Sequence, residues 1–116
     1  MEFSALTARA LDVRRLYEVH EQRRYGRQWS LEELMLGLVG DVGDLAKLVQ
    51  ALEGVRLIDD PHERIEHELA DLLWAIIVIA EKCGVDLETS FFQTMAELES
   101  SLHIPNERKN VERSDP

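Results

Sequence analysis

Two pairs of acidic residues lie beside apolar stripes in this sequence. Asp41 and Asp44 are three residues apart in LVGDVGDL, and Glu68 and Asp71 have the same spacing in HELADLLW. Residues three apart share one face of a helix, so two antiparallel helices with these pairs opposed would bring four carboxylates together. Burial and mutual repulsion disfavour four ionised carboxylates unless some protonate or a cation binds. Oxygen ligands in this number favour Mg²⁺, or Mn²⁺ in its place, over zinc.

Surface ion pairing is the alternative interpretation of these acids, because acidic pairs are common on solvated helices. Asp44 and Glu68 each have a basic residue about one helical turn away, whereas Asp41 and Asp71 have no lysine or arginine at those spacings. Asp71 is the only charged residue in positions 69–80. A di-iron carboxylate bundle is disfavoured, because it requires Glu-x-x-His motifs and no glutamate here precedes a histidine by three residues.

Four helices are predicted from apolar residues at three- and four-residue steps. Capping boxes are expected at the start of the second helix, from Ser30 and Glu33, and of the third, from Asp60 and Glu63. The expected helices run from about Ala5 to Tyr25, from Leu31 to a stop at Gly54, from Pro61 to a stop at Gly84, and onward from a cap at Asp86.

These helices predict an all-α, four-helix bundle, since short connections favour antiparallel neighbours. We expect residues 1–104 to form one domain and residues 105–116 a flexible tail. The third helix is apolar nearly all round and should be buried on most sides. One small bundle would leave part of it in water, so we expect a homodimer or homotetramer. Gly37, Gly40 and Gly43 are candidates for allowing another helix to approach closely.

The composition and the charge exclude some classes of partner and indicate a cellular location. The net charge of −10 argues against nucleic acid polymers as partners. Residues 1–30 nevertheless carry six arginines against four acids, whereas residues 31–104 carry four basic and sixteen acidic groups. The single Cys83 fits a reducing compartment. The N-terminal residues lack the apolar core of a signal peptide, and the longest apolar run, residues 72–80, is too short to span a bilayer. We therefore expect a soluble cytoplasmic protein without membrane contacts.

The paired motif resembles that of the all-α nucleoside triphosphate pyrophosphohydrolases of the MazG type, E-E-x-x-E followed by E-x-x-D. Glycine in place of the first acid is similar to the dCTP pyrophosphatase branch, which has G-E-V-G-E-L there. The phrase CGVDLE resembles the family's turn into its last helix, and the likeness covers about residues 25–100. The positions of the first element are Gly40, Asp41 and Asp44, and those of the second are Glu68 and Asp71.

This resemblance implies a Mg²⁺-dependent hydrolase that cleaves a (d)NTP between the α- and β-phosphates, giving the (d)NMP and pyrophosphate. It makes the four acids Asp41, Asp44, Glu68 and Asp71 the metal ligands and catalytic residues. One of them, or a neighbouring group, would orient or deprotonate the attacking water. Aspartate in place of glutamate at two positions shortens the carboxylate's reach by one methylene, so the helices must approach more closely.

Substrate contacts are harder to assign. The family often has K-x-x-x-N-x-x-R in its last helix, but Thr94 and Leu98 occupy the first two positions here, and neither Leu102 nor its neighbours supply the arginine. Replacement phosphate ligands could come from the arginines of residues 14–27 or from Lys47. Trp29 either stacks on a nucleobase or packs as a hydrophobic staple against Leu34, and Trp74 is expected in the core or a subunit interface. The candidate substrate-binding residues are Trp29, Tyr25, Arg27 and Lys47.

Two other functions remain open from the sequence. The missing basic residues of the last helix are compatible with a non-catalytic bundle that binds metal or nucleotide, or that acts as an interaction subunit. A helical bundle with no ligand is the third possibility.

Overall fold

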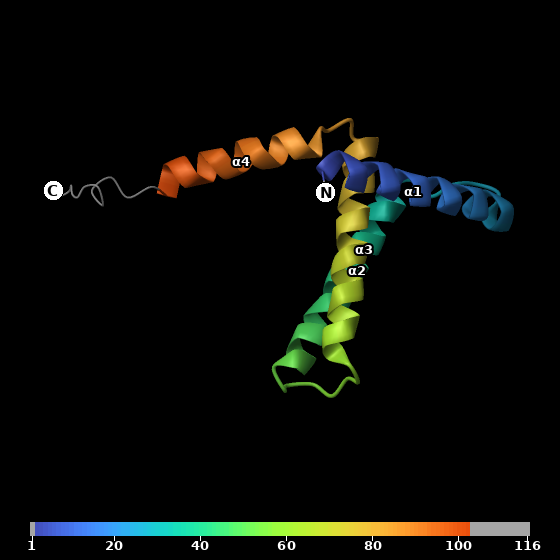
Figure 1. Ribbon diagram of the computed structural model, residues 1–116. Coiled ribbons are helices and arrows are strands. Elements are labelled where there is room, and N and C mark those ends of the chain that lie inside the picture. Colours follow the sequence, from blue (N-terminus) through green and yellow to red (C-terminus); the bar gives the residue numbers. More distant parts are fainter. Residues whose placement is uncertain (1, 103–116) are drawn as a thin grey trace. The chain divides into compact units, whose positions relative to one another are not determined.

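The computed structural model describes residues 2–102, which form four α-helices (Figure 1). The all-α class is confirmed. The chain divides into two compact units, residues 1–85 and 86–116, each described by itself below. The predicted flexible tail lies outside the described residues. The helices are α1 (Phe3–Tyr25), α2 (Leu31–Leu52), α3 (Pro61–Lys82) and α4 (Leu87–Leu102).

The helix boundaries follow local sequence signals, with one exception. Ser30 and Glu33 form the predicted capping box at the start of α2. The capping box predicted for α3 is wrong: Asp60 has φ 50° and ψ 54°, and its side chain makes no cap hydrogen bond. A capping side chain needs an extended backbone to reach the first free N–H groups, and the left-handed conformation of Asp60 prevents this. Pro61 starts α3 instead, with its fixed φ and no N–H to satisfy.

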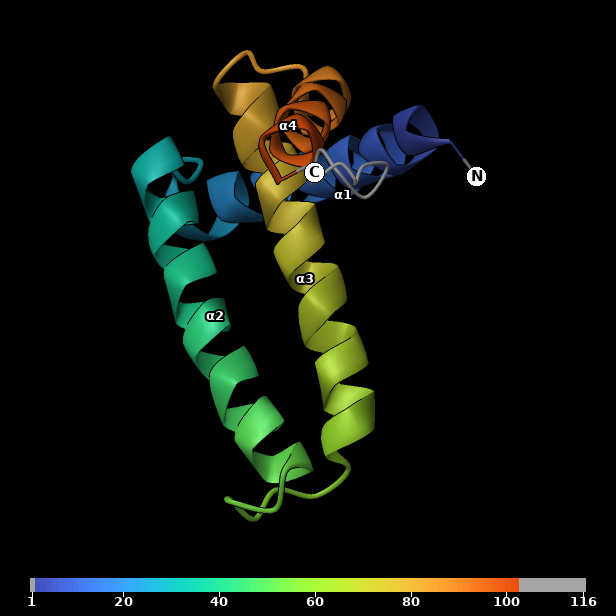
Figure 2. The same ribbon diagram turned by 90° about the vertical axis from the view of Figure 1, so that its left-hand side faces the viewer.

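Helices α2 and α3 lie antiparallel and side by side, and α1 crosses them near the start of α2 and the end of α3 (Figures 1 and 2). The indole N–H of Trp74 in α3 donates a 3.0 Å hydrogen bond to the carbonyl oxygen of Ala10 in α1. This antiparallel arrangement determines which residues of α2 and α3 face each other. The buried apolar side chains of this unit are Ala10, Leu34, Leu48, Leu72, Ala75, Ile77 and Val78.

Helix α3 leaves one apolar face exposed in the single chain. Leu69, Leu73 and Ile76 form one stripe on it and are 52%, 43% and 42% exposed. They lie at steps of four and three residues, so they share one face of the helix. This agrees with the expectation that one small bundle leaves part of α3 in water, because the first unit has too few elements to cover this face. Burial of α3 on most sides by a second copy stays a prediction.

The glycines of α2 do not mediate close helix packing within the described chain. A Cβ atom added at Gly37, Gly40 or Gly43 would meet no other heavy atom within 4 Å, and all three residues are exposed. No helix of the described chain therefore uses these glycines for close approach, and approach by a helix of a second copy stays a prediction.

The second unit is described as far as residue 102 and consists there of α4. Asp86 caps this helix as predicted: its carboxylate accepts a 3.2 Å hydrogen bond from the Thr89 backbone N–H. No residue of α4 is buried. Among residues 2–102, none of the helices is both long enough and apolar enough to cross a membrane.

Candidate active site

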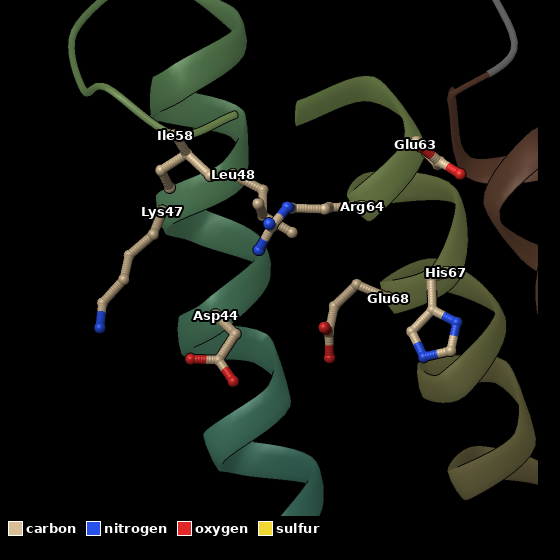
Figure 3. Close-up of a pocket in the computed structure, with 8 residues that line it drawn as sticks. All are labelled: Asp44, Lys47, Leu48, Ile58, Glu63, Arg64, His67 and Glu68. Atoms are coloured by element: carbon tan, nitrogen blue, oxygen red, sulfur yellow. The ribbon is translucent and has the colours of Figure 1, made fainter. Parts of the chain in front are cut away.

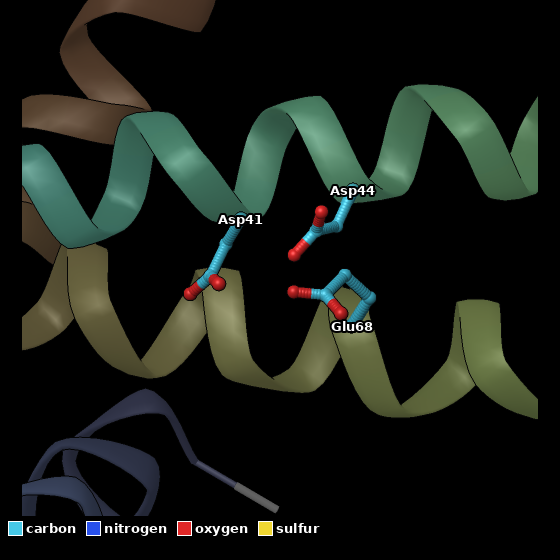
Figure 4. A group of neighbouring side chains, drawn as sticks. All are labelled: Asp41, Asp44 and Glu68. Atoms are coloured by element: carbon cyan, nitrogen blue, oxygen red, sulfur yellow. The ribbon is translucent and has the colours of Figure 1, made fainter.

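Three of the four predicted acids converge where α2 and α3 face each other (Figure 4). Asp41 and Asp44 project from consecutive turns of α2, and Glu68 projects toward them from α3. Each side chain offers a carboxylate oxygen, and these oxygens all lie within 4.8 Å of one another. The i, i+3 spacing places both aspartates on one face, and the antiparallel arrangement places Glu68 opposite them.

The carboxylates of this acidic cluster (Asp41, Asp44 and Glu68) are not paired with basic side chains among the described residues. Burial raises the pKa of Glu68 above its usual value, and the negative charges of Asp41, Asp71 and Asp44 raise it further. Among the described residues, none of the three acids is in an ion pair; the pairs that the sequence offered, with Lys47 and Arg64, do not form. A set of oxygen donors with surplus negative charge fits a hard divalent cation such as Mg²⁺ or Mn²⁺.

Asp71, the fourth predicted ligand, lies outside this close group. Its Oδ2 atom is 3.2 Å from Nε2 of His67, one turn earlier on α3, and its side chain is 50% exposed. Asp71 still contributes to the electrostatics of the cluster, because its charge is among the causes of the raised pKa of Glu68. The structure therefore brings three carboxylates together and places the fourth beside them, paired with a histidine.

A cavity of about 510 Å³ adjoins the acidic cluster on the side of α1. Asp41 and Asp71 contribute its acidic wall. Four aromatic residues from three parts of the chain line the cavity: Tyr17, Tyr25, Trp29 and Trp74. The rings of Tyr17 and Trp74 are in contact, with centroids 5.4 Å apart and planes inclined at 52°. The size and the lining of this cavity suit a flat, partly polar ligand of nucleoside size.

The predicted substrate-binding residues fall in different places. Tyr25 and Trp29 line the aromatic cavity. Arg27 is engaged elsewhere: it donates hydrogen bonds of 2.8 and 2.6 Å to the Glu33 carboxylate, and together with the capping N–H of Ser30 it lowers the pKa of Glu33 to about 2. Lys47 lines a second cavity.

Sequence reasoning missed two residues of the aromatic cavity. Tyr17 was not considered, and Trp74 was expected in the core or a subunit interface, yet both line the cavity wall. Their proximity depends on α1 crossing α3, and no spacing within either helix signals that crossing.

A buried ion pair between Arg14 and Glu21 forms part of the cavity wall. The guanidinium of Arg14 donates two hydrogen bonds, of 2.9 and 3.0 Å, to the carboxylate of Glu21, and both side chains are 5% exposed. Arg14 Nε also reaches Glu18 at 3.3 Å. Glu21 Oε1 accepts a further hydrogen bond, of 2.9 Å, from the backbone N–H of Trp29. The pair therefore fixes the start of the connection to α2 against α1, and with it the backbone of a cavity residue.

The second cavity, of about 530 Å³, lies at the other end of the acidic cluster (Figure 3). Asp44 and Glu68 line it from opposite sides, and the basic residues Lys47 and Arg64 stand beside them. In Figure 3 the Arg64 side chain extends from α3 across the space toward α2. The acidic cluster thus lies between an aromatic cavity and a cavity with basic residues.

Comparison with known proteins relates the chain to one group of enzymes. It is 35% identical over 91 residues to dCTP pyrophosphatase 1 of Rattus norvegicus and 34% identical over 90 residues to dCTP pyrophosphatase 1 of Homo sapiens. Both matches cover 72% of this chain and 53% of the relative. The Bos taurus protein of the same name is 37% identical over 82 residues, which are 66% of this chain and 48% of that protein.

These matches confirm the resemblance that the paired motif predicted: the chain is related to the MazG-like nucleoside triphosphate pyrophosphohydrolases. Within that class, its relatives are the dCTP pyrophosphatases. The chain spans about half the length of the curated relatives it matches. No family model matches the chain, and no solved structure matches it.

Proposed function

We propose that this protein is a Mg²⁺-dependent pyrophosphohydrolase that cleaves a (d)NTP between the α- and β-phosphates, releasing the (d)NMP and pyrophosphate. The observation that carries the proposal is the position of the acidic cluster, whose three carboxylates meet at the edge of a 510 Å³ aromatic cavity. The relationship to the dCTP pyrophosphatases supports it and makes dCTP the first substrate to test.

In this proposal Asp41, Asp44 and Glu68 hold the divalent ion, with Asp71 as the fourth acid at the cavity side. Mn²⁺ is expected to substitute for Mg²⁺. When bound, the ion offsets the charge of the phosphates and polarises a phosphoryl oxygen. Without it, a polyphosphate would be repelled by the acidic cluster.

The chain's own residues bind and orient the substrate. The aromatic cavity takes the nucleoside, with Trp29, Tyr25, Tyr17 and Trp74 available to pack against the base. The α-phosphate then lies over the acidic cluster. The oxygen of an attacking water forms a bond to the α-phosphorus while the bond from that phosphorus to the bridging oxygen breaks. The bridging oxygen keeps the electron pair and leaves with the pyrophosphate, and an acid of the site accepts the water's proton.

The proposal is tested by measuring pyrophosphate release from a panel of dNTPs and NTPs that includes dCTP, with Mg²⁺, with Mn²⁺ and with excess chelator. We expect release from at least one nucleotide, dependent on the metal, and its loss in Asp41→Asn. Release from none of them would contradict the proposal. The absence of basic residues in α4 suggests an alternative, a bundle that binds nucleotide without hydrolysing it. Calorimetry with a non-hydrolysable dNTP identifies this alternative, because such a bundle would bind the nucleotide and release no pyrophosphate.

We also propose that the protein assembles as a homodimer or homotetramer in the cytoplasm, with the exposed stripe of α3 covered by a second copy. The stripe of Leu69, Leu73 and Ile76 is roughly half exposed, and contiguous apolar surface of this kind marks interaction sites.

Placing a charge in this stripe should dissociate the assembly. We expect Leu73→Lys to sediment as a smaller species than the wild type in analytical ultracentrifugation, because the ammonium group would be desolvated in an apolar interface. Arg56→Gln, in the connection between α2 and α3, is the control and should sediment like the wild type. Equal sedimentation of Leu73→Lys and wild type would rule out this stripe as the interface.

A further inference from the structure

The two cavities that meet at the acidic cluster have different lining residues. A substrate that spans the cluster can therefore be expected to bind in one orientation. The cavity on the α1 side has aromatic walls and takes its acids from Asp41 and Asp71. The cavity at the other end is lined by the acids Asp44, Glu63 and Glu68, and Lys47 and Arg64 are its basic residues. Since α2 and α3 are antiparallel, moving from the first cavity to the second means moving one turn onward along α2 and one turn back along α3.

We infer that Lys47 and Arg64 bind the pyrophosphate part of the substrate, so that the triphosphate runs from the aromatic cavity across the acidic cluster into the second cavity. This inference rests on the proposed function and adds to it the orientation of the substrate and two phosphate-binding residues. The pyrophosphate carries most of the substrate's negative charge, and the cluster alone would repel it. Side-chain cations at this end supply the compensation that the basic residues of the last helix supply in the related family.

Of the eight other basic residues of the first unit, four are in ion pairs, and the other four line neither cavity: Arg9, Arg23, Arg24 and Arg56. Arg14 is buried against Glu21, Arg15 pairs with Asp12, and Arg27 pairs with Glu33. Lys82 lies 3.7 Å from Glu18. By contrast, within residues 2–102 neither Lys47 nor Arg64 forms an ion pair.

Lys47 and Arg64 also approach the same cavity from opposite helices. Lys47 lies one turn after Asp44 on α2, and Arg64 lies one turn before Glu68 on α3. Arg64 points across the space between the helices, whereas Lys47 lies along the outer side of α2 near Asp44 (Figure 3). Both residues line this cavity, so a phosphate group bound in it could accept hydrogen bonds from both. His67 also lines this cavity, but its Nε2 atom is directed to Asp71.

The test compares binding of the two products by calorimetry in the presence of Mg²⁺: inorganic pyrophosphate and dCMP. We expect Lys47→Gln and Arg64→Gln each to weaken pyrophosphate binding about tenfold, because a charge-assisted hydrogen bond is lost, and to leave dCMP binding unchanged. The conservative variants Lys47→Arg and Arg64→Lys should restore most of the affinity. Arg56→Gln is the control: it also removes one positive charge, at a residue that lies between Lys47 and Arg64 in the sequence but lines neither cavity. This variant should bind both products like the wild type.

Three results would overturn the inference. They are unchanged pyrophosphate binding in both glutamine variants, weakening of dCMP binding as large as that of pyrophosphate, and no binding of pyrophosphate by the wild type. Circular dichroism confirms that the variants are folded. These outcomes are separate from failure of the proposed function, which is read from pyrophosphate release by the wild type. A protein that binds pyrophosphate through Lys47 and Arg64 yet hydrolyses no nucleotide would retain this inference and lose the enzymatic proposal.

Discussion

Replacing Glu68 with glutamine should abolish most of the pyrophosphate release and at the same time make the metal-free protein more stable at neutral pH. The loss of activity is expected to be about a thousandfold, because a metal ligand supports several kcal/mol of transition-state stabilisation and about 1.4 kcal/mol corresponds to a factor of ten. The change removes one negative charge and little volume, so its effects are electrostatic.

The expected gain in stability follows from the raised pKa of Glu68, which is due first to burial and then to Asp41, Asp71 and Asp44. An acid whose pKa is higher in the folded protein than in the unfolded chain destabilises the fold when it is ionised. This penalty is fully present above the folded-state pKa and disappears below 4.5, the ordinary pKa of a glutamate in an unfolded chain. Glu68→Gln should therefore unfold at a higher temperature than the wild type at pH 7, and the difference should vanish as the pH falls below that value.

Thermal unfolding with and without millimolar Mg²⁺ checks this expectation. The ion should stabilise the wild type, because it binds only the folded state, and should stabilise Glu68→Gln much less. Glu66→Gln is the matched control: Glu66 is an exposed acid on the same helix, 3.6 Å from His62, and lies outside the cluster. A Glu68→Gln protein that is less stable than the wild type at pH 7, without metal, would contradict the electrostatic description of the site.

Breaking the buried ion pair of α1 is the second change with a large expected effect. Glu21→Ala leaves the guanidinium of Arg14 buried without its main partner and the backbone N–H of Trp29 without an acceptor. Loss of one member of a buried pair costs about 3–5 kcal/mol. In a unit of this size the unfolding midpoint should fall by about 10 °C or more. Thermal unfolding followed by tryptophan fluorescence measures the midpoint and reports on the surroundings of Trp29 and Trp74 together.

Two comparisons separate the roles of this pair. Arg15→Ala, next in sequence, removes an exposed arginine that pairs with Asp12, and should change the unfolding free energy by only about 0.5 kcal/mol or less. Replacing both partners, with Arg14→Met and Glu21→Leu, should recover most of the lost stability. It should still fall about 1 kcal/mol short, because the Trp29 N–H lacks its hydrogen bond. A Glu21→Ala protein as stable as the Arg15→Ala control would show that the pair does not hold α1 in place.

The sequence predicted the parts of this site that depend on local periodicity. The helices and the faces that carry Asp41, Asp44 and Glu68 follow from repeats of three and four residues, and Ser30 and Glu33 signalled the start of α2. The opposition of the acids required only that α2 and α3 be antiparallel, which their short connection favours.

The remaining features depend on how the helices are placed in space, which local patterns do not encode. The crossing of α1 over α3 brings Tyr17 to Trp74 and forms the aromatic cavity. The contact between His67 and Asp71 depends on the side-chain conformation of Asp71, which directs its carboxylate to His67 and not to the acidic cluster. The left-handed backbone of Asp60 reflects the path of the α2–α3 connection rather than its capping sequence.

The most direct test of the central claim is a titration of Mn²⁺ followed by electron paramagnetic resonance, which reports bound ions without requiring catalysis. If Asp41, Asp44 and Glu68 form a divalent cation site, the wild type should bind Mn²⁺ saturably, Mg²⁺ should displace it, and Asp44→Asn should lose most of the affinity while Glu66→Gln keeps it. Equal binding by Asp44→Asn and the wild type, or no saturable binding by the wild type at millimolar Mn²⁺, would contradict the account.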